Sequence, residues 1–253
     1  MPRIARIRSE TGIYHVMVRG INKQDIFMEP EDRCRYLETL DTVKKKTRCQ
    51  VYAYCLMRNH VHLVIAEGDD DNIGEIMRRL GSSYVYWYNH KYERVGYLFQ
   101  DRFLSEPIES EPYLIAAVRY VHQNPIKAGI TTECAHYVWS SYLAYTTGKE
   151  HRGELTDTAF ALGVTGGLQQ FVEFHGETSK YDFQDVEDSA NASTAEVLAA
   201  VQLIMGGHPV GMLKEMNPTE RNRVLRELKT IPGVSSAKIA RLVGLGRKVV
   251  ERA

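Results

Sequence analysis

Two histidines, His60 and His62, lie one residue apart in the apolar run N-H-V-H-L-V-I of residues 59–65. Side chains alternate between the two faces of a β-strand, so both imidazoles project from one face while apolar side chains fill the other. At ~3.4 Å per residue the two Cα atoms are about 7 Å apart, which lets both rings converge on one ion. The pattern predicts a metal site on a strand, although two partly exposed histidines on a sheet surface would share it.

A tyrosine and an asparagine four residues apart form the second candidate set, in the segment Y-V-H-Q-N-P of residues 120–125. Positions four apart share one face of a helix, so Tyr120 and Asn124 are neighbours there. A phenol, with a pKa near 10, is a poor nucleophile at neutral pH. A divalent cation that withdraws charge from a nearby phosphate removes much of that handicap. If strand and helix pack together, Tyr120 can cut a phosphodiester, with Asn124 as a candidate third metal ligand.

Tyr113 is the competing nucleophile, because it lies two turns earlier on nearly the same helical face. At 1.5 Å per residue the two tyrosines are roughly 10 Å apart along the axis, so only one can address a given phosphate. The proximity of Asn124 favours Tyr120. Attack would leave a covalent phosphotyrosine and a free 3′ hydroxyl, and the stored phosphodiester energy allows the break to be resealed without ATP. His122 points away from Tyr120, and we expect it to be structural.

The segments that must position these residues show clear periodicity and end signals. We expect strands at 12–19, 50–56, 60–66 and 97–100, and helices that begin at 30, 73 and 110 or 111. The third helix should stop at Asn124, because a proline disfavours helical geometry in the residue before it. The order β-α-β-β-α-β-α predicts an α+β fold, a ferredoxin-like antiparallel sheet with helices on one face.

The net charge of zero hides an uneven distribution along the 253 residues. Basic residues outnumber acidic ones by one in the first 150 residues and by five in the last 61, whereas the stretch between them has a net charge of −6. We therefore expect a first domain at 1–147, an acidic extension and linker at 148–192, and a basic, all-α domain at 193–253.

The basic C-terminal segment also carries a recognisable helical spacing. A helix is expected to start at Ser235 or Ser236, with the small residue Ala240 inside it and Gly244 at the following turn. This is helix-turn-helix spacing and predicts a DNA-binding unit, with a plain helical packing domain as the alternative. The residues expected on or near its recognition helix include Arg247 and Lys248.

Four sequence blocks carry a family resemblance: N-H-V-H-L-V-I, G-Y-L-F-Q-D-R-F, Y-V-H-Q-N-P-I-K-A-G and V-W-S-S-Y. Together they closely resemble the single-tyrosine HUH transposases, especially the REP-associated tyrosine transposases. The resemblance covers residues 10–146 and implies a ferredoxin-like transesterase that acts on single-stranded DNA and depends on Mg²⁺ or Mn²⁺. It implies metal binding by His60 and His62 and makes Tyr120 the nucleophile. Asn124 falls where relatives place a Gln or Asn ligand.

The resemblance implies a transposase that nicks and rejoins hairpin-flanked DNA through a covalent 5′-phosphotyrosine. The rival hypothesis is a domesticated, non-cutting regulator that binds palindromic repeats, and a structural zinc protein is disfavoured because no cysteine lies at ligand spacing. Relatives include obligate dimers and monomers, so a homodimer is left open. The expected phosphate contacts of the first domain are Arg19, Lys23, Arg78, Arg79, Arg102 and Lys127.

Composition favours an ordinary soluble protein, with 43% hydrophobic and 25% charged residues. No segment approaches the roughly 20 apolar residues that a bilayer span needs. The four cysteines lack C-x-x-C spacing and are expected to be reduced thiols. We therefore expect a cytoplasmic, nucleoid-associated protein without membrane contact.

Overall fold

The structure is a computed structural model, and the chain folds as two compact units, Met1–Gln184 and Asp185–Ala253. None of the described helices has the length and apolar character that a bilayer crossing requires. All four cysteines are free thiols, in agreement with the sequence-based expectation. The residues that the structure describes are 7–69, 71–177, 183, 201, 204–205, 212–213, 216–230, 239–240 and 243–252.

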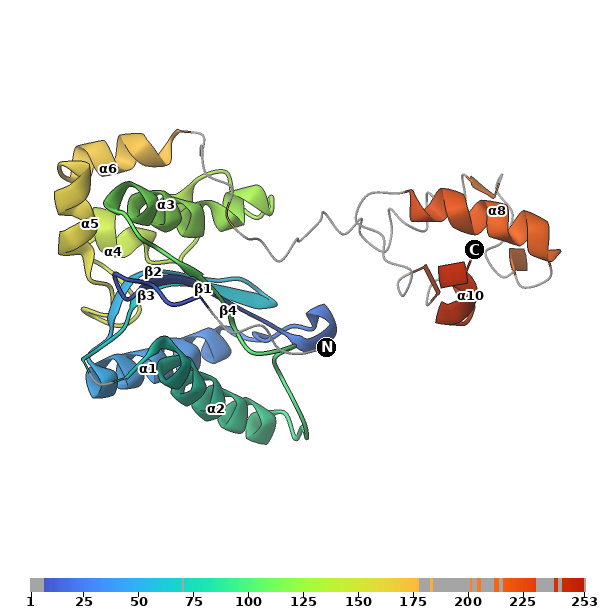
Figure 1. The fold of residues 1–253 in the computed structure, drawn as a ribbon, viewed down its shortest axis with the longest axis horizontal. Helices are drawn as coiled ribbons and strands as arrows, with labels where there is room; N and C mark the ends of the chain where they lie inside the picture. Colours follow the sequence, from blue (N-terminus) through green and yellow to red (C-terminus); the bar gives the residue numbers. More distant parts are fainter. Residues whose placement is uncertain are drawn as a thin grey trace. The chain divides into compact units, whose positions relative to one another are not determined.

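The first unit is built on a four-stranded antiparallel sheet with strand order β2-β3-β1-β4 (Figure 1). Its strands are β1 (Ile13–Arg19), β2 (Gln50–Leu56), β3 (His60–Ala66) and β4 (Leu104–Pro107). The predicted hairpin of β2 and β3 is confirmed, because alternation and the intervening turn are local signals. In the register between strands, Met17 lies opposite His62, Arg19 opposite His60, and His15 opposite Glu106.

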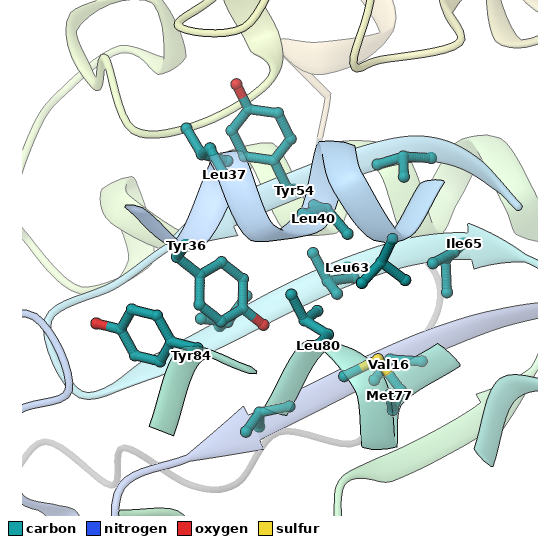
Figure 2. Close-up of a cluster of buried hydrophobic side chains, with 14 of the residues drawn as sticks. Val16, Tyr36, Leu37, Leu40, Tyr54, Leu63, Ile65, Met77, Leu80 and Tyr84 are labelled. Carbon is teal, nitrogen blue, oxygen red and sulfur yellow. The ribbon is translucent and has the colours of Figure 1, made fainter. Parts of the chain in front are cut away.

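Two long helices, α1 (Pro30–Thr47) and α2 (Ile73–Lys91), cover one face of this sheet (Figure 1). The N-terminus of α1 is a capping box between Glu29 and Asp32, and the Asn72 side chain caps α2 by accepting a hydrogen bond from the Glu75 amide. The apolar stripes of both helices pack on the sheet. Figure 2 shows side chains of this core, among them Val16, Tyr36, Leu37, Leu40, Leu63, Ile65, Leu80 and Tyr84.

The opposite face of the sheet is covered as well, so the prediction of helices on one face was wrong. The covering helices are α3 (Glu111–Lys127), α4 (Tyr142–Thr147), α5 (Thr158–Thr165) and α6 (Leu168–His175). Both faces of β2 and β3 are buried, with Ala53, Cys55 and Val64 directed toward α3. A sheet that is apolar on both faces requires cover on both. α5 and α6, which fall in the expected 148–192 linker, belong to this packed layer.

Helix α3 does not stop at Asn124 but runs through Pro125 to Lys127. Proline removes one intrahelical hydrogen bond and disfavours a helical residue before it, yet here both residues are buried in the core. The Asn124 side-chain amide donates to the Tyr120 carbonyl at 2.9 Å, and the Ala128 amide donates to the Asn124 carbonyl at 3.0 Å. Tertiary burial therefore overrides the local preference for the last turn.

The expected strand at 97–100 is not a strand, and the fourth strand is β4, further along the chain. Phe99 forms a single bridge with Gly20, flanked by backbone hydrogen bonds of 2.9 Å from Ile21 to Leu98 and from Gln100 to Arg19. The chain turns into a short 3-10 helix, η1 (Ile21–Lys23), directly after Gly20, where an added Cβ would lie 2.1 Å from the Gln24 carbonyl oxygen. This turn prevents the pairing from extending into a ladder.

The second unit has an apolar core of its own. Its described helices include α8 (Pro218–Lys229), capped by the Asn217 side chain, and α10 (Arg247–Arg252). Leu225, Leu228 and Val250 are fully buried in this core, and Gly244 adopts a φ of 66°. The expected helix start at Ser235 or Ser236 lies outside the described residues, so the helix-turn-helix stays a prediction.

Candidate active site

Strand β3 places both histidines on the sheet face that packs against α3. His62 is fully buried and His60 is 6% exposed, and their ring centroids are 5.0 Å apart with the planes nearly perpendicular. Val61, Leu63 and Ile65 occupy the other face, in the core under α1 and α2. The period-two pattern of the strand therefore delivers both imidazoles to one buried surface.

Helix α3 brings Tyr120 to the same surface. The Tyr120 ring lies 5.7 Å from the His62 ring and 5.4 Å from the ring of His15, both in edge-on arrangements. Asn124 lies one turn further on, buried, with its amide nitrogen bonded to the Tyr120 carbonyl. That bond leaves the Asn124 Oδ1 as the side-chain atom with lone pairs for a ligand.

His62 has the properties of a metal-binding imidazole. Burial, followed by the nearby His60, His15 and Lys127, holds its pKa well below the ordinary value, so the ring is neutral. Its Nε2 is buried and has no hydrogen-bond partner among the described residues. A neutral imidazole with an unused nitrogen lone pair fits a divalent cation. In the described part of the chain, no group of three or more His, Cys, Asp or Glu side chains is placed to hold a metal ion.

A third histidine, His15, is a site residue that the sequence analysis missed. Its Nε2 lies 3.1 Å from His62 Nδ1, and its Nδ1 lies 3.6 Å from a carboxylate oxygen of Glu106. The Tyr113 hydroxyl donates a short hydrogen bond to the other oxygen of Glu106. His15 shares the alternating pattern of β1, but only the pairing of β1 with β3 and β4 reveals its neighbours.

Asn59, the residue before β3, also contacts the histidine pair. Its Oδ1 lies 2.7 Å from His60 Nδ1, and its Nδ2 donates to the Lys23 carbonyl at 3.3 Å. The second bond fixes which end of the amide faces His60, because a carbonyl oxygen can only accept. Each histidine of the pair is thus held through its Nδ1 by a side chain outside the pair.

Two further side chains lie against the Tyr120 ring. The Lys127 ammonium is 3.8 Å from the ring centroid, within the range of a cation–π contact. The Phe183 ring is 4.6 Å from Tyr120 and 5.1 Å from Tyr113, and it is almost fully buried there. Tyr120 itself is 2% exposed, so the phenol is covered in this structure.

The environments of the two candidate nucleophiles differ. Tyr113 engages its hydroxyl with Glu106, whereas Tyr120 packs edge-on against His15 and His62. His122 faces away from both: its Nδ1 lies 2.9 Å from His175 Nε2 and its Nε2 lies 2.8 Å from the Ser141 hydroxyl. The structural role expected for His122 is confirmed. The choice of Tyr120 as the nucleophile stays a prediction.

The expected phosphate contacts of the first unit are divided between the two faces of its sheet. Arg19 lies on β1 opposite His60, on the site face of the sheet, and Lys127 is at the end of α3. Arg78 and Arg79 lie on α2, on the other face, and both pair with Glu75. Arg78 and Arg102 line a cavity of about 400 Å³ on that other face. Lys23 is exposed in η1, and Arg247 and Lys248 belong to α10 of the second unit.

A phenol and two imidazoles on one face of an antiparallel α+β sheet define a class of site suited to phosphoryl transfer. Residues 9–124 match the family model described as "Transposase IS200 like". The domain that these residues build belongs to the IS200-like transposase family, which confirms the resemblance drawn from the sequence blocks.

A solved structure of a REP-associated tyrosine transposase bound to a REP hairpin is similar to this chain, at 18% identity and a TM-score of 0.49. The similarity covers 63% of this chain and 96% of that one. No curated protein matches the chain.

Proposed function

We propose that this protein is a metal-dependent DNA transposase that nicks and rejoins hairpin-flanked single-stranded DNA through a covalent 5′-phosphotyrosine. The observation that carries the proposal is the contact of Tyr120 with the buried His62, within a domain of the IS200-like transposase family. His60, His62 and Asn124 would hold a divalent cation, Mg²⁺ or Mn²⁺. When bound, such a cation withdraws charge from the scissile phosphate.

The proposed reaction exchanges one phosphodiester for another. The Tyr120 oxygen forms a bond to phosphorus while the bond to the 3′ oxygen of the preceding nucleotide breaks. The proton that the phenol gives up is balanced by the one that the departing 3′ oxygen gains as a hydroxyl. Attack of a 3′ hydroxyl on the phosphotyrosine reverses the exchange and rejoins the strand, with no external energy source.

Substrate access follows from what surrounds the phenol. A DNA strand reaches Tyr120 only when the Phe183 ring leaves it, because that ring packs against the phenol with 4.6 Å between the ring centroids. Arg19 and Lys127 are the basic residues placed to meet phosphates there, since both lie at the face that carries His60 and Tyr120. Unpaired DNA suits such a site better than a duplex, whose phosphates are held away from a buried phenol.

The proposal is tested by incubating the protein with hairpin oligonucleotides and Mn²⁺ and resolving covalent adducts on denaturing gels. A 3′-end label is expected to travel with the protein, and a 5′-end label to leave on a fragment with a 3′ hydroxyl. Tyr120→Phe should abolish the adduct, and His60→Ala with His62→Ala should do the same. Tyr113→Phe, the matched control two turns earlier, should retain it. An undiminished adduct in Tyr120→Phe would refute the assignment of the nucleophile.

The second candidate function is a non-cutting regulator that binds palindromic repeats. The observations that favour it are the covered phenol and the basic C-terminal unit, where Lys248 is exposed on α10. On this hypothesis, hairpin binding persists when His60 and His62 are replaced, falls steeply with salt, and no metal supports cleavage. The same gel and binding assays therefore separate the two functions.

A further inference from the structure

Four buried or half-buried side chains form a connected chain behind the histidine pair. Tyr113 donates to Glu106, the Glu106 carboxylate faces His15 Nδ1 at 3.6 Å, and His15 Nε2 lies 3.1 Å from His62 Nδ1. These side chains come from four elements, since Tyr113 is on α3, Glu106 on β4, His15 on β1 and His62 on β3. It ends at the His62 Nε2, the buried nitrogen described above.

The contact between the two imidazoles holds one proton. When both rings are neutral, nitrogen atoms 3.1 Å apart form a hydrogen bond only if one nitrogen carries the proton and the other accepts it. If His15 Nε2 is the donor, His62 must carry its own proton on Nε2 and has no lone pair there. If His62 Nδ1 is the donor, His62 Nε2 has its lone pair directed into the site.

Glu106 selects between these arrangements. Its distance of 3.6 Å from His15 Nδ1 is longer than a hydrogen bond, but an N–H dipole that faces a carboxylate is favoured and a lone pair that faces it is repelled. His15 therefore keeps its proton on Nδ1 and accepts at Nε2. The proton between the rings then belongs to His62 Nδ1. A ring nitrogen's partner sets the tautomer of the whole imidazole.

We propose that His15, oriented by Glu106, is a positioning residue that holds His62 as the Nδ1–H tautomer with its Nε2 lone pair in the site. Asn59 has the same role for His60, because its Oδ1 accepts from His60 Nδ1 at 2.7 Å. The inference rests on the proposed function, which gives the two lone pairs a metal to bind. It assigns roles to three residues outside the expected ligand set.

The direct test is the tautomer of each histidine in the metal-free protein at pH 7.5, read from long-range ¹H–¹⁵N spectra of labelled imidazoles. We expect Nδ1–H tautomers for His60 and His62 in the unsubstituted chain. Glu106→Gln should change the His62 pattern and leave His60 alone, whereas Asn59→Ala should do the reverse. His15→Phe removes both ring nitrogens and should free His62 to populate the Nε2–H form. An Nε2–H tautomer of His62 in the unsubstituted chain would overturn the inference.

A second readout is the affinity for Mn²⁺ without DNA, measured by calorimetry or by electron paramagnetic resonance of free Mn²⁺. We expect Glu106→Gln and His15→Phe each to weaken binding by roughly 10- to 100-fold, the usual effect of removing a partner that orients a ligand. The side chain in the Glu106→Gln variant keeps an oxygen that can accept the Tyr113 hydrogen bond. This variant therefore still tests the inference if His15→Phe fails to fold. The matched control is Glu133→Gln, which removes the carboxylate from the exposed His136–Glu133 pair and should leave Mn²⁺ affinity unchanged.

Failure of the inference and failure of the proposed function give different results. If the unsubstituted chain forms the Tyr120 adduct and binds Mn²⁺, but Glu106→Gln changes neither the His62 tautomer nor the affinity, the positioning role is wrong and the function stands. If the tautomers respond as expected and no adduct forms with any metal, the positioning role stands and the nuclease function is wrong.

Discussion

Tyr120 and Tyr113 occupy the same helix but differ in what surrounds their hydroxyls. The carboxylate of Glu106 accepts a hydrogen bond from the Tyr113 hydroxyl. Tyr120 instead has the Lys127 ammonium over its ring and the imidazoles of His15 and His62 at its edge. A positive charge beside a phenol favours the more nucleophilic, deprotonated form, so residue-level electrostatics separates two otherwise similar tyrosines.

Removal of the Lys127 charge should slow attack by Tyr120. We expect Lys127→Met to lower the single-turnover rate of adduct formation by roughly fivefold at saturating DNA, because the loss of the ammonium removes about 1 kcal/mol of stabilisation of the developing phenolate. Lys127→Arg, which keeps the charge, should stay close to the unsubstituted rate. An unchanged rate in Lys127→Met at saturating DNA would show that the lysine only helps DNA to bind.

At the scale of the elements, the start of α1 depends on one buried carboxylate. Asp32 accepts hydrogen bonds from the Met28 and Glu29 amides and from Lys91 at the end of α2. Burial alone raises the pKa of Asp32, but the bonds from Lys91, from the two amides and from Tyr92 outweigh it and lower the pKa. The capping box thereby ties α1 to α2 over the sheet.

Asp32→Asn should lower the free energy of unfolding by about 2 kcal/mol at pH 7, measured by urea denaturation. Because the folded pKa is below the ordinary value of 3.8, the stabilisation is complete above that pH and is lost as the pH falls through the folded pKa. The difference between the two proteins should therefore shrink below pH 4. Asp41→Asn, the control on the same helix, removes only a surface pair with Lys45 and should cost well under ~1 kcal/mol. A cost for Asp32→Asn that stays constant down to pH 3 contradicts the ionic role.

The attachment of α6 to α3 depends on a pair of buried histidines. His175 donates from Nδ1 to the Phe171 carbonyl and accepts from His122 at Nε2. Burial is the main cause that lowers the pKa of His175 to about 4, aided by the charge of Arg119 and opposed by the bond to Phe171. Both rings are therefore neutral near pH 7, and their ring nitrogens have hydrogen-bond partners.

Acidification should weaken the attachment of α6 to α3 and lower the free energy of unfolding. The unfolded chain binds a proton at His175 near pH 6.5 and the folded chain only near pH 4, so stability is full above 6.5 and falls between those values. We expect a loss of up to about 3 kcal/mol from this residue, at 1.36 kcal/mol per pH unit. His175→Gln cannot titrate, so its stability deficit at pH 7 should narrow by pH 4.5 in urea titrations. If His175→Gln loses the same free energy of unfolding at pH 7 and at pH 4.5, protonation of His175 does not destabilise the folded chain.

At the scale of the whole molecule, each unit has a separate apolar core. The core of the first unit lies on both faces of its sheet, and that of the second unit surrounds Leu225 and Leu228. Separate cores predict separate folding, because each unit buries its own apolar surface. The proposed chemistry resides in the first unit and the basic helices in the second.

A fragment of Met1–Gln184 should fold with a cooperative transition and form the Tyr120 adduct at saturating DNA as fast as the full chain. Its hairpin affinity should be weaker, and the dependence of binding on salt concentration shallower, because the basic second unit no longer contacts phosphates. Binding titrations at several salt concentrations measure both quantities. Equal affinity and equal salt dependence would contradict a DNA-binding role for the second unit.

Local patterns in the sequence were sufficient for much of the first unit. The hairpin at 50–56 and 60–66 and the starts of α1 and α2 follow from alternation and capping residues, which act over a few positions. The shared face of His60 and His62 follows from the same alternation. The family blocks supplied a candidate nucleophile and an expected class of chemistry, and residues 9–124 match the family that they indicated.

Only the tertiary structure decided which distant elements meet. The cover on both sheet faces, the continuation of α3 through Pro125 and the position of β4 depend on burial and strand pairing between remote segments. The contact of His15 with His62 and Glu106 has the same origin, since β1, β3 and β4 are far apart in the chain. Periodicity reports which face a side chain takes, but it contains no information on the side chain it meets there, because that depends on the free energy of packing the whole chain.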